Sequence, residues 1–169
     1  ELIGGPNKPN FKVVQQIAKA LKYNYCLEID YQSRKSLSEK RLISPCRLVY
    51  VLNRYHLRAY SYTSTGWRDF VLTRILKASK SDSKIPWIEP SKDSDWSKKV
   101  ELTFAPNPEL PSDIVETLEM DYPIENGELK VITNLANEIY AERRFSVRDL
   151  ESDKRHWIHL DNKRRLLKD

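Results

Sequence analysis

The run RYHLRAY at positions 54–60 places basic and apolar side chains in strict alternation. One parity carries Tyr55, Leu57 and Ala59, and the other carries Arg54, His56 and Arg58. Successive side chains of a strand point to opposite faces, so this run predicts a strand with one apolar face and one basic face. A guanidinium group matches phosphate oxygens with two parallel hydrogen bonds, and an imidazole can donate to an anion or stack. The chemistry predicted for this strand is therefore anion binding.

A second run, RDFVLTRI at positions 68–75, brackets an apolar pair with two further arginines of the same parity. Together the two runs predict a small, strongly curved sheet with a basic rim, whose expected partner is a nucleotide or a nucleic acid. The alternative is a solvated face whose arginines pair with Glu39 and Asp69. The candidate anion-site residues from the pattern alone are His56, Arg58, Arg68 and Arg74.

Other chemistries find little support in the sequence. His156, His159 and Asp161 lie close together, but a strand there would turn the two imidazoles to opposite faces, so we expect no metal site. Cys26 and Cys46 lack a metal-type spacing, and we expect buried thiols. The chain has four glycines and neither a nucleophile elbow nor a glycine-rich phosphate loop. We therefore expect a non-catalytic protein that needs no cofactor.

The net charge of +5 is unevenly distributed along the 169 residues. Positions 1–83 hold 15 Lys and Arg against 6 Asp and Glu, whereas positions 84–169 hold 14 against 18. An anion is therefore expected in the first part. With no apolar run of about 18 residues and only two cysteines, we expect a cytoplasmic protein without a membrane partner. The chain begins without Met, and we expect it to be a fragment of a longer protein.

The hydrophobic periodicity predicts an α+β protein. Apolar residues at helical spacing predict a helix over 11–23 with Asn10 as its N-cap. Alternation then predicts five short antiparallel strands, which suggest a small SH3-like or Sm-like barrel. Pro45 inside the second strand implies an edge position or a bulge. The predicted strands cover 27–32, 41–51, 54–62, 67–73 and 74–79.

A change of composition divides the chain after the barrel. We expect a linker and helix over 1–24, the barrel domain over 25–80, a linker over 81–98 and a small α+β domain over 99–169. Trp87 and Trp96 are unusual for a free linker and are expected to pack against a neighbouring surface. In the last domain we expect strands near 99–104 and 129–133, a helix from 112 with Ser112 as N-cap, and a solvated tail at 163–165.

Short motifs in the first part occur in a characteristic order. They are Ile29-Asp30-Tyr31, Arg41-Leu42-Ile43-Ser44-Pro45, Tyr55-His56-Leu57 and the run 68–75. Together they resemble the WYL domain family. Within that family the chain is most similar to regulators encoded beside bacterial phage-defence systems (BrxR/CapW-like), through Tyr31-Gln32-Ser33 and the runs 55–60 and 68–75. Segments 100–108, 119–127 and 160–162 resemble the C-terminal extension of the same subfamily.

The resemblance implies the ligand-sensing and dimerization region of a bacterial transcriptional repressor of a phage-defence locus, with a nucleotide or oligonucleotide effector. It adds Tyr31, Ser33 and Arg41 to the candidate ligand-binding residues. Such regulators are homodimers that bind operator DNA through an N-terminal winged helix-turn-helix, which we do not find in these residues. The sequence departs from the family pattern at Tyr55, where the family has Trp, and at Cys46, where the subfamily often has His.

Two alternatives to a sensor remain. A direct single-stranded nucleic-acid-binding module would also use basic strands interleaved with Tyr and Trp, because bases stack on aromatic rings. An enzyme acting on a nucleotide ranks last, because His56 has no carboxylate in evident register.

Overall fold

The computed structural model of the chain describes residues 7–34, 37–146, 148 and 153–167. The chain divides into two compact units, Glu1–Asp93 and Ser94–Asp169. The division falls inside the segment 81–98, and residues 81–93 belong to the first unit. No helix in the described part is long and apolar enough to cross a membrane.

The first unit begins with helix α1 (Phe11–Tyr23), as predicted. Asn10 caps it, because its side-chain oxygen accepts a hydrogen bond from the backbone N–H of Lys12 at 2.9 Å. The helix ends at Asn24, whose φ of 55° is the left-handed conformation that asparagine tolerates better than most residues. Its apolar stripe is buried over Val13, Ile17 and Ala20.

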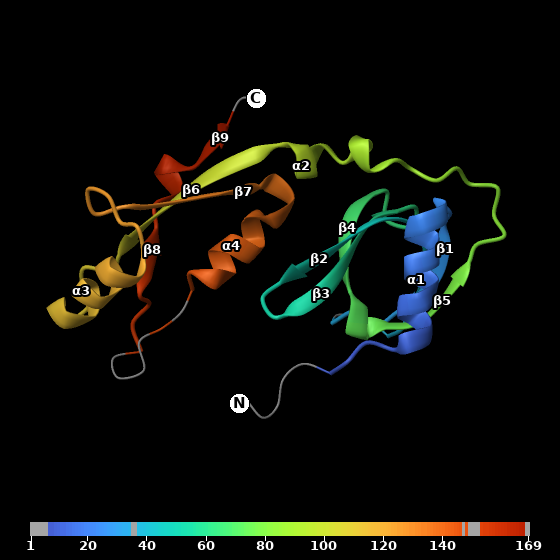
Figure 1. The fold of residues 1–169 in the computed structure, drawn as a ribbon, viewed down its shortest axis with the longest axis horizontal. Helices are drawn as coiled ribbons and strands as arrows, with labels where there is room; N and C mark the ends of the chain where they lie inside the picture. The colour runs from blue at the N-terminus through green and yellow to red at the C-terminus, as the bar shows by residue number, and fades with distance from the viewer. Residues whose placement is uncertain (1–6, 35–36, 147, 149–152, 168–169) are drawn as a thin grey trace. The chain divides into compact units, whose positions relative to one another are not determined.

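Five antiparallel strands follow α1, and their pairing order is β4-β3-β2-β1-β5. The five predicted strands are confirmed, but the sheet does not close into the predicted barrel, since β4 and β5 are the two ends of the pairing order. The turn η1 (Leu72–Arg74) carries the chain from one end strand to the other, so the sheet is strongly curved. Figure 1 shows this curvature around α1. The strands are β1 (Leu27–Tyr31), β2 (Glu39–Val51), β3 (Arg54–Ser61), β4 (Gly66–Val71) and β5 (Ile75–Lys80).

Pro45 lies in a central strand, because β2 is flanked by β1 and β3. The register between β2 and β3 shifts between Pro45 and Arg47. Proline has no N–H for the ladder, and a bulge removes the need for one. The predicted bulge is thus confirmed, and Pro45 also lies where the pairing of β2 with β1 has ended, since the last β1–β2 pair is Leu27 with Ile43.

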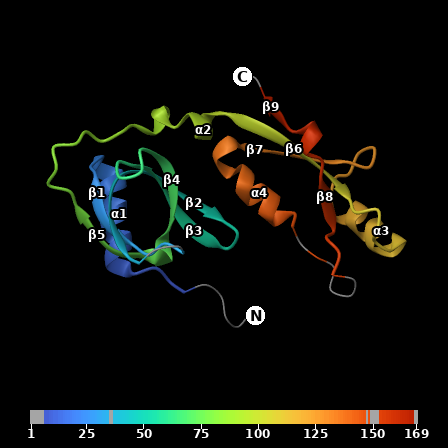
Figure 2. The same cartoon turned by 180° about the vertical axis from the view of Figure 1, so that it is seen from behind.

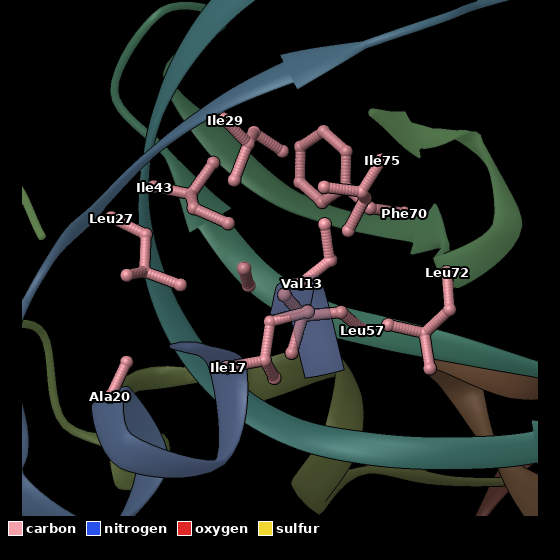
Figure 3. Close-up of a cluster of buried hydrophobic side chains, with 11 residues drawn as sticks. Val13, Ile17, Ala20, Leu27, Ile29, Ile43, Leu57, Phe70, Leu72 and Ile75 are labelled. Carbon is pink, nitrogen blue, oxygen red and sulfur yellow. The ribbon is translucent and has the colours of Figure 1, made fainter. Parts of the chain in front are cut away.

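The core of the first unit lies between α1 and one face of the sheet. Side chains from the helix meet side chains from all five strands and from η1 (Figure 3). Burying each large aliphatic side chain contributes roughly 1.5–3 kcal/mol, which is how an amphipathic helix of 13 residues is held in place. The buried cluster consists of Val13, Ile17, Ala20, Leu27, Ile29, Ile43, Leu57, Ala59, Phe70, Leu72 and Ile75.

Residues 81–93, which we call the strap, lie against the first unit instead of forming a free linker. The backbone N–H of Ser81 donates to the carbonyl of Cys26 at 3.0 Å. The indole N–H of Trp87 donates to the carbonyl of Pro45 at 3.1 Å. The backbone N–H of Ile88 donates to the hydroxyl of Ser44 at 2.8 Å. The strap therefore fastens to β2 and to Cys26, the residue before β1, and the predicted packing of Trp87 is confirmed.

The second unit is a small α+β domain, as predicted. Its four-stranded sheet has β6 at the centre, with β7 on one side and both β8 and β9 on the other. Figures 1 and 2 show β6 alongside β7 from both sides. The elements are α2 (Ser94–Ser97), β6 (Lys99–Pro106), α3 (Ser112–Asp121), β7 (Leu129–Asn134), η3 (Leu135–Asn137), α4 (Glu138–Arg144), β8 (Trp157–His159), η4 (Asp161–Lys163) and β9 (Arg165–Leu167).

Two local predictions for this unit are wrong. Ser112 is the first residue of α3, and the N-cap position is Pro111, with no side-chain capping hydrogen bond. The expected solvated tail at 163–165 is part of the fold, because β9 pairs with β6. All three of its basic side chains form ion pairs, Lys163 with Glu128, Arg164 with Glu138 and Arg165 with Glu101.

One face of β6 supplies the centre of the second core. Its inward residues Val100, Leu102 and Phe104 are at most 2% exposed. The ring of Phe104 stacks on Phe145 with centroids 4.6 Å apart, and Phe145 meets Trp157 edge-on at 5.6 Å. Aromatic packing of this kind joins α4 to β8 through the middle of the domain.

Candidate anion-binding site

Strand β3 has the two faces that its sequence predicts. Leu57 and Ala59 belong to the core beneath α1. His56 and Arg58 point the other way, but each is only 5% exposed, so this face is not the solvated basic rim that we expected. For Arg58 the physical reason is the strap, whose residue Asp93 is buried against it.

Arg58 is held in an internal ion-pair network. Its Nε donates to Oδ2 of Asp93 at 2.8 Å and its Nη2 donates to Oδ1 at 2.9 Å, a two-point contact with a carboxylate that is 0% exposed. Its Nη1 lies 3.3 Å from Oδ1 of Asp69, which is its register partner on β4. Burial lowers the pKa of Arg58, but the hydrogen bond to Asp93 and the charge of Asp69 outweigh it, so the pKa is raised. Arg58 therefore fastens the end of the strap.

Other predicted residues meet at one end of the sheet, where β1 and β4 end. The backbone N–H of Val71 donates to the hydroxyl of Tyr31 at 3.2 Å, and His56 is the register partner of Val71. Three residues further on, the carbonyl of Arg74 accepts from the backbone N–H of Gln32 at 2.9 Å. Tyr31 also meets Phe70 edge-on at 5.0 Å, so it serves the core as well. This end of the sheet is the candidate anion-binding site.

Two guanidinium groups act on His56 at this end of the sheet. Burial lowers the pKa of His56; the carboxylate of Asp69 raises it, and the positive charges of Arg54 and Arg74 lower it further. The net shift is downward. Arg54 and Arg74 are half-buried, and within the described ranges neither forms an ion pair. The positive charges of Arg54 and Arg74 therefore help to lower the pKa of His56, and an anion can offset those charges.

Arg54 is the residue that sequence reasoning missed as a ligand candidate. The signal was present, since Arg54 shares the parity of His56 and begins the same strand. It was less visible than the other arginines because it lies outside the two motifs that carry the family resemblance.

Three predicted candidates lie away from this end of the sheet, and a fourth is in a loop beside it. Arg58 faces the strap, as described above. Arg41 forms an ion pair with Glu39, two residues earlier on β2. Arg68 is exposed, is the register partner of Ala59 on the opposite face from His56, and donates to the carbonyl of Trp67 at 2.9 Å. Ser33 is half-buried in the loop after β1, where its carbonyl accepts from the side chain of Gln32 at 3.1 Å.

Comparison with known protein families agrees with the division of the chain into two units. Residues 12–79 match the WYL domain model, and residues 99–166 match the model described as BrxR transcriptional regulator, C-terminal dimerization domain. The chain joins a WYL domain to a BrxR-type dimerization domain. The resemblance inferred from the motifs is thereby confirmed for both units.

The WYL and BrxR-type domains together are similar to curated repressors. The DNA-binding transcriptional repressor CapW of Pseudomonas aeruginosa is 30% identical over 149 residues, which is 86% of this chain and 48% of the repressor. CapW of Escherichia coli (strain KTE188) is 29% identical over 69% of this chain and 39% of its own length, and CapW of Stenotrophomonas maltophilia is 24% identical over 81% and 46%. The chain thus spans about half the length of the relatives it matches.

A second feature of the WYL domain is an aromatic pocket of about 470 Å³ near the start of β4. Tyr60 and Trp67 form one wall and meet edge-on with centroids 5.6 Å apart. Trp87 and Ile88 of the strap form another, held by their hydrogen bonds to β2. Lys92 lies at its rim. Aromatic rings held in this way suit a planar or apolar group.

The BrxR-type domain contains the histidines that the sequence places near Asp161. Nδ1 of His159 lies 2.9 Å from Oδ1 of Asp161 and 3.7 Å from Oε1 of Glu142, and its ring stacks on Phe104 at 4.9 Å. Across the residues described here, no cluster of three or more His, Cys, Asp and Glu side chains could hold a metal ion.

The lowered pKa of His56 predicts a pH dependence of stability. Its ordinary pKa is 6.5, so between 6.5 and the folded-state pKa the unfolded chain binds a proton that the folded chain does not. The stability that His56 contributes is therefore complete above about pH 6.5 and declines as the pH falls below it. We expect the unfolding free energy, measured with urea from pH 7.5 to 5, to fall less steeply in His56→Gln than in the unsubstituted chain. Equal slopes would contradict this assignment.

Proposed function

We propose that this chain is the effector-sensing and dimerization region of a DNA-binding transcriptional repressor, and that a nucleotide-type anion binds where β1 and β4 end. The similarity to CapW repressors supports the repressor role, and the BrxR-type domain supports a homodimer. Operator binding belongs to a part of the protein outside these residues, which cover about half of such a repressor. The regulated genes, in this proposal, belong to a phage-defence locus.

One observation carries the choice of ligand and site. Arg54 and Arg74 both act on the buried imidazole of His56, and neither is neutralised by a carboxylate among the described side chains. A phosphate placed between them would accept charge-assisted hydrogen bonds from both, and each such bond contributes roughly 1.5–3 kcal/mol. Tyr31, whose hydroxyl is at the same end of the sheet, is placed to stack on or bond to the remainder of the ligand.

The site also suggests how binding is transmitted. A bound anion would offset the charges of Arg54 and Arg74, so it would raise the pKa of His56 and favour its protonation. A protonated His56 would lie one pleat from Arg58, which holds the strap through Asp93. An effector changes operator affinity only if it binds one conformation better than another, and the Arg58 network gives the WYL domain a part that can respond.

The proposal is tested on the complete regulator from which this chain derives. Small molecules and oligonucleotides released by denaturing the purified protein are identified by mass spectrometry, and operator binding is then measured with and without them. We expect a phosphate-bearing ligand that changes operator affinity at least about fivefold, a typical allosteric coupling. A regulator whose operator affinity is the same with every nucleotide and oligonucleotide tested would contradict the sensing function.

A second candidate function is the direct binding of single-stranded nucleic acid. The aromatic pocket of Tyr60, Trp67 and Trp87 favours it, because base stacking on an aromatic ring contributes about 1–3 kcal/mol per base. The two functions differ in salt dependence. A strand that contacts several phosphates loses affinity steeply as salt rises, whereas a mononucleotide effector loses little. Titration of a labelled 12-nucleotide strand between 50 and 200 mM salt, with the 169-residue chain, separates them.

A further inference from the structure

The BrxR-type domain leaves one long strand edge unpaired. β7 is the end strand of its sheet, and in the described part of the chain no strand pairs with its outer side. Its register with β6 runs over six residues, from Lys99 opposite Asn134 to Phe104 opposite Leu129, without a shift. The outer side of β7 therefore presents a regular row of backbone donors and acceptors, which is a template for another strand.

The opposite edge of the same sheet is protected. It is shared by β8 and β9, which have three residues each and are separated by the turn η4. Short, interrupted strands and charged side chains are the usual means of protecting an edge. β7 has neither a proline nor a bulge, and Lys130 is its single charged residue. The contrast between the two edges of this sheet indicates that the outer edge of β7 is open for pairing with another strand.

The side chains of β7 suit an interface as well. Ile132 is 60% exposed and is the register partner of Glu101, on the face of the sheet away from the core. Val131, on the core face, is half-buried. A strand laid against β7 would cover apolar side chains on both faces of the sheet. Asn134 is engaged already, because its side chain donates to the carbonyl of Trp96 in α2.

We propose that β7 pairs antiparallel with β7 of a second copy of this chain, joining two four-stranded sheets into one across a twofold axis. This rests on the proposed function, in which the domain forms a homodimer, and it names the surface. A second copy is the occupant because the domain matches a dimerization model, and because an antiparallel pair of identical strands is self-complementary, as a twofold interface requires. An axis perpendicular to the sheet brings one β7 residue opposite its own copy.

The first test is the oligomeric state of the 169-residue chain. We expect a dimer by sedimentation at about 50 μM, a concentration well above a micromolar dissociation constant. Ile132→Asp puts two carboxylates into the seam, and we expect its dissociation constant to rise about 100-fold, tenfold for each copy. Met120→Asp is the matched control: Met120 is 84% exposed on α3, and we expect that variant to stay dimeric. Circular dichroism and thermal unfolding confirm that both variants are folded.

A second measurement locates the axis. Single cysteines at 130, 131, 132 and 133 are oxidised, and we expect at least one to form an intermolecular disulfide, with the unsubstituted chain and its two native cysteines as the control. Suppose that Ile132→Asp dimerizes as tightly as the unsubstituted chain and that no cysteine at these positions forms a cross-link. This result would overturn the β7 seam and leave the proposed function standing. A chain that is monomeric at this concentration would overturn the seam together with the proposed homodimer.

Discussion

Replacing Asp93 with alanine is expected to lower the unfolding free energy of the WYL domain by about 3–5 kcal/mol. The reason is that Arg58 would keep its charge in a buried position, with Asp69 at 3.3 Å as its remaining carboxylate partner among those described. The side chain of Arg58 is 7% exposed and that of Asp93 is fully buried, so water cannot replace the lost partner. Urea unfolding of the 169-residue chain, followed by tryptophan fluorescence, measures the effect.

Two control variants distinguish the loss of the Arg58–Asp93 ion pair from a general effect of substituting a residue in the strap. Glu89→Ala removes an exposed carboxylate from the same strap, and we expect a change within about 0.5 kcal/mol. The double substitution Arg58→Met with Asp93→Leu replaces the pair by apolar side chains, and we expect it to recover most of the loss, as buried pairs commonly do. If Asp93→Ala is as stable as the unsubstituted chain to within about 1 kcal/mol, the pair behaves like an exposed salt bridge and the strap is not held by it.

The second large effect concerns ligand binding. Arg54→Ala and Arg74→Ala are each expected to weaken a phosphate-bearing probe about tenfold or more, because each removes a charge-assisted hydrogen bond. Neither arginine has an ion-pair partner in the described structure, so we expect the melting temperature to change little. The probes are a panel of nucleoside monophosphates and a labelled single-stranded oligonucleotide, titrated at fixed salt and pH.

Arg68→Ala is the matched control for these variants. Arg68 is an exposed arginine of the same domain, on the opposite face of the sheet from His56, and we expect its loss to leave probe affinity within about twofold. Arg74→Lys should not restore full affinity where a two-point contact with phosphate is lost. A weakening by Arg68→Ala that equals the weakening by Arg74→Ala would show that the chain attracts anions by overall charge, and the localised site would have to be abandoned.

Sequence periodicity was sufficient for the helix and the five strands of the WYL domain. The helix 11–23 and the five strands could be predicted because each has a strong local signal, such as the helical spacing of Phe11, Val14, Ile17, Ala18 and Leu21. The faces of β3 were predicted for the same reason. The face of the helix that is buried is a different one, through Val13, Ile17 and Ala20, and Phe11 is 72% exposed. The open sheet was not, because closure depends on how two end strands approach each other through η1, and that is not a local property.

The burial and the partners of individual arginines could not be predicted from the pattern. Arg58 and His56 share a face with period two, and nothing in their neighbourhood indicates that Asp93, 35 residues further on, covers one of them. Pro-rich, Ser-rich and Lys-rich composition in 81–93 is typical of a linker, but this segment is bonded to β2 and, through Asp93, to β3. Register alone separates Arg68 from His56, and register is set by pairing over the whole sheet.

The most direct test of the anion site is an NMR titration of His56. The chain has three histidines, so the imidazole signals of His56, His156 and His159 can be assigned by substitution and followed from pH 8 to 4. We expect the pKa of His56 to lie below its ordinary value of 6.5 in the free chain and to rise when a nucleoside monophosphate or a short single strand is bound. If a bound probe leaves the pKa of His56 unchanged and shifts the pKa of His156 or His159 instead, the proposed anion site is contradicted.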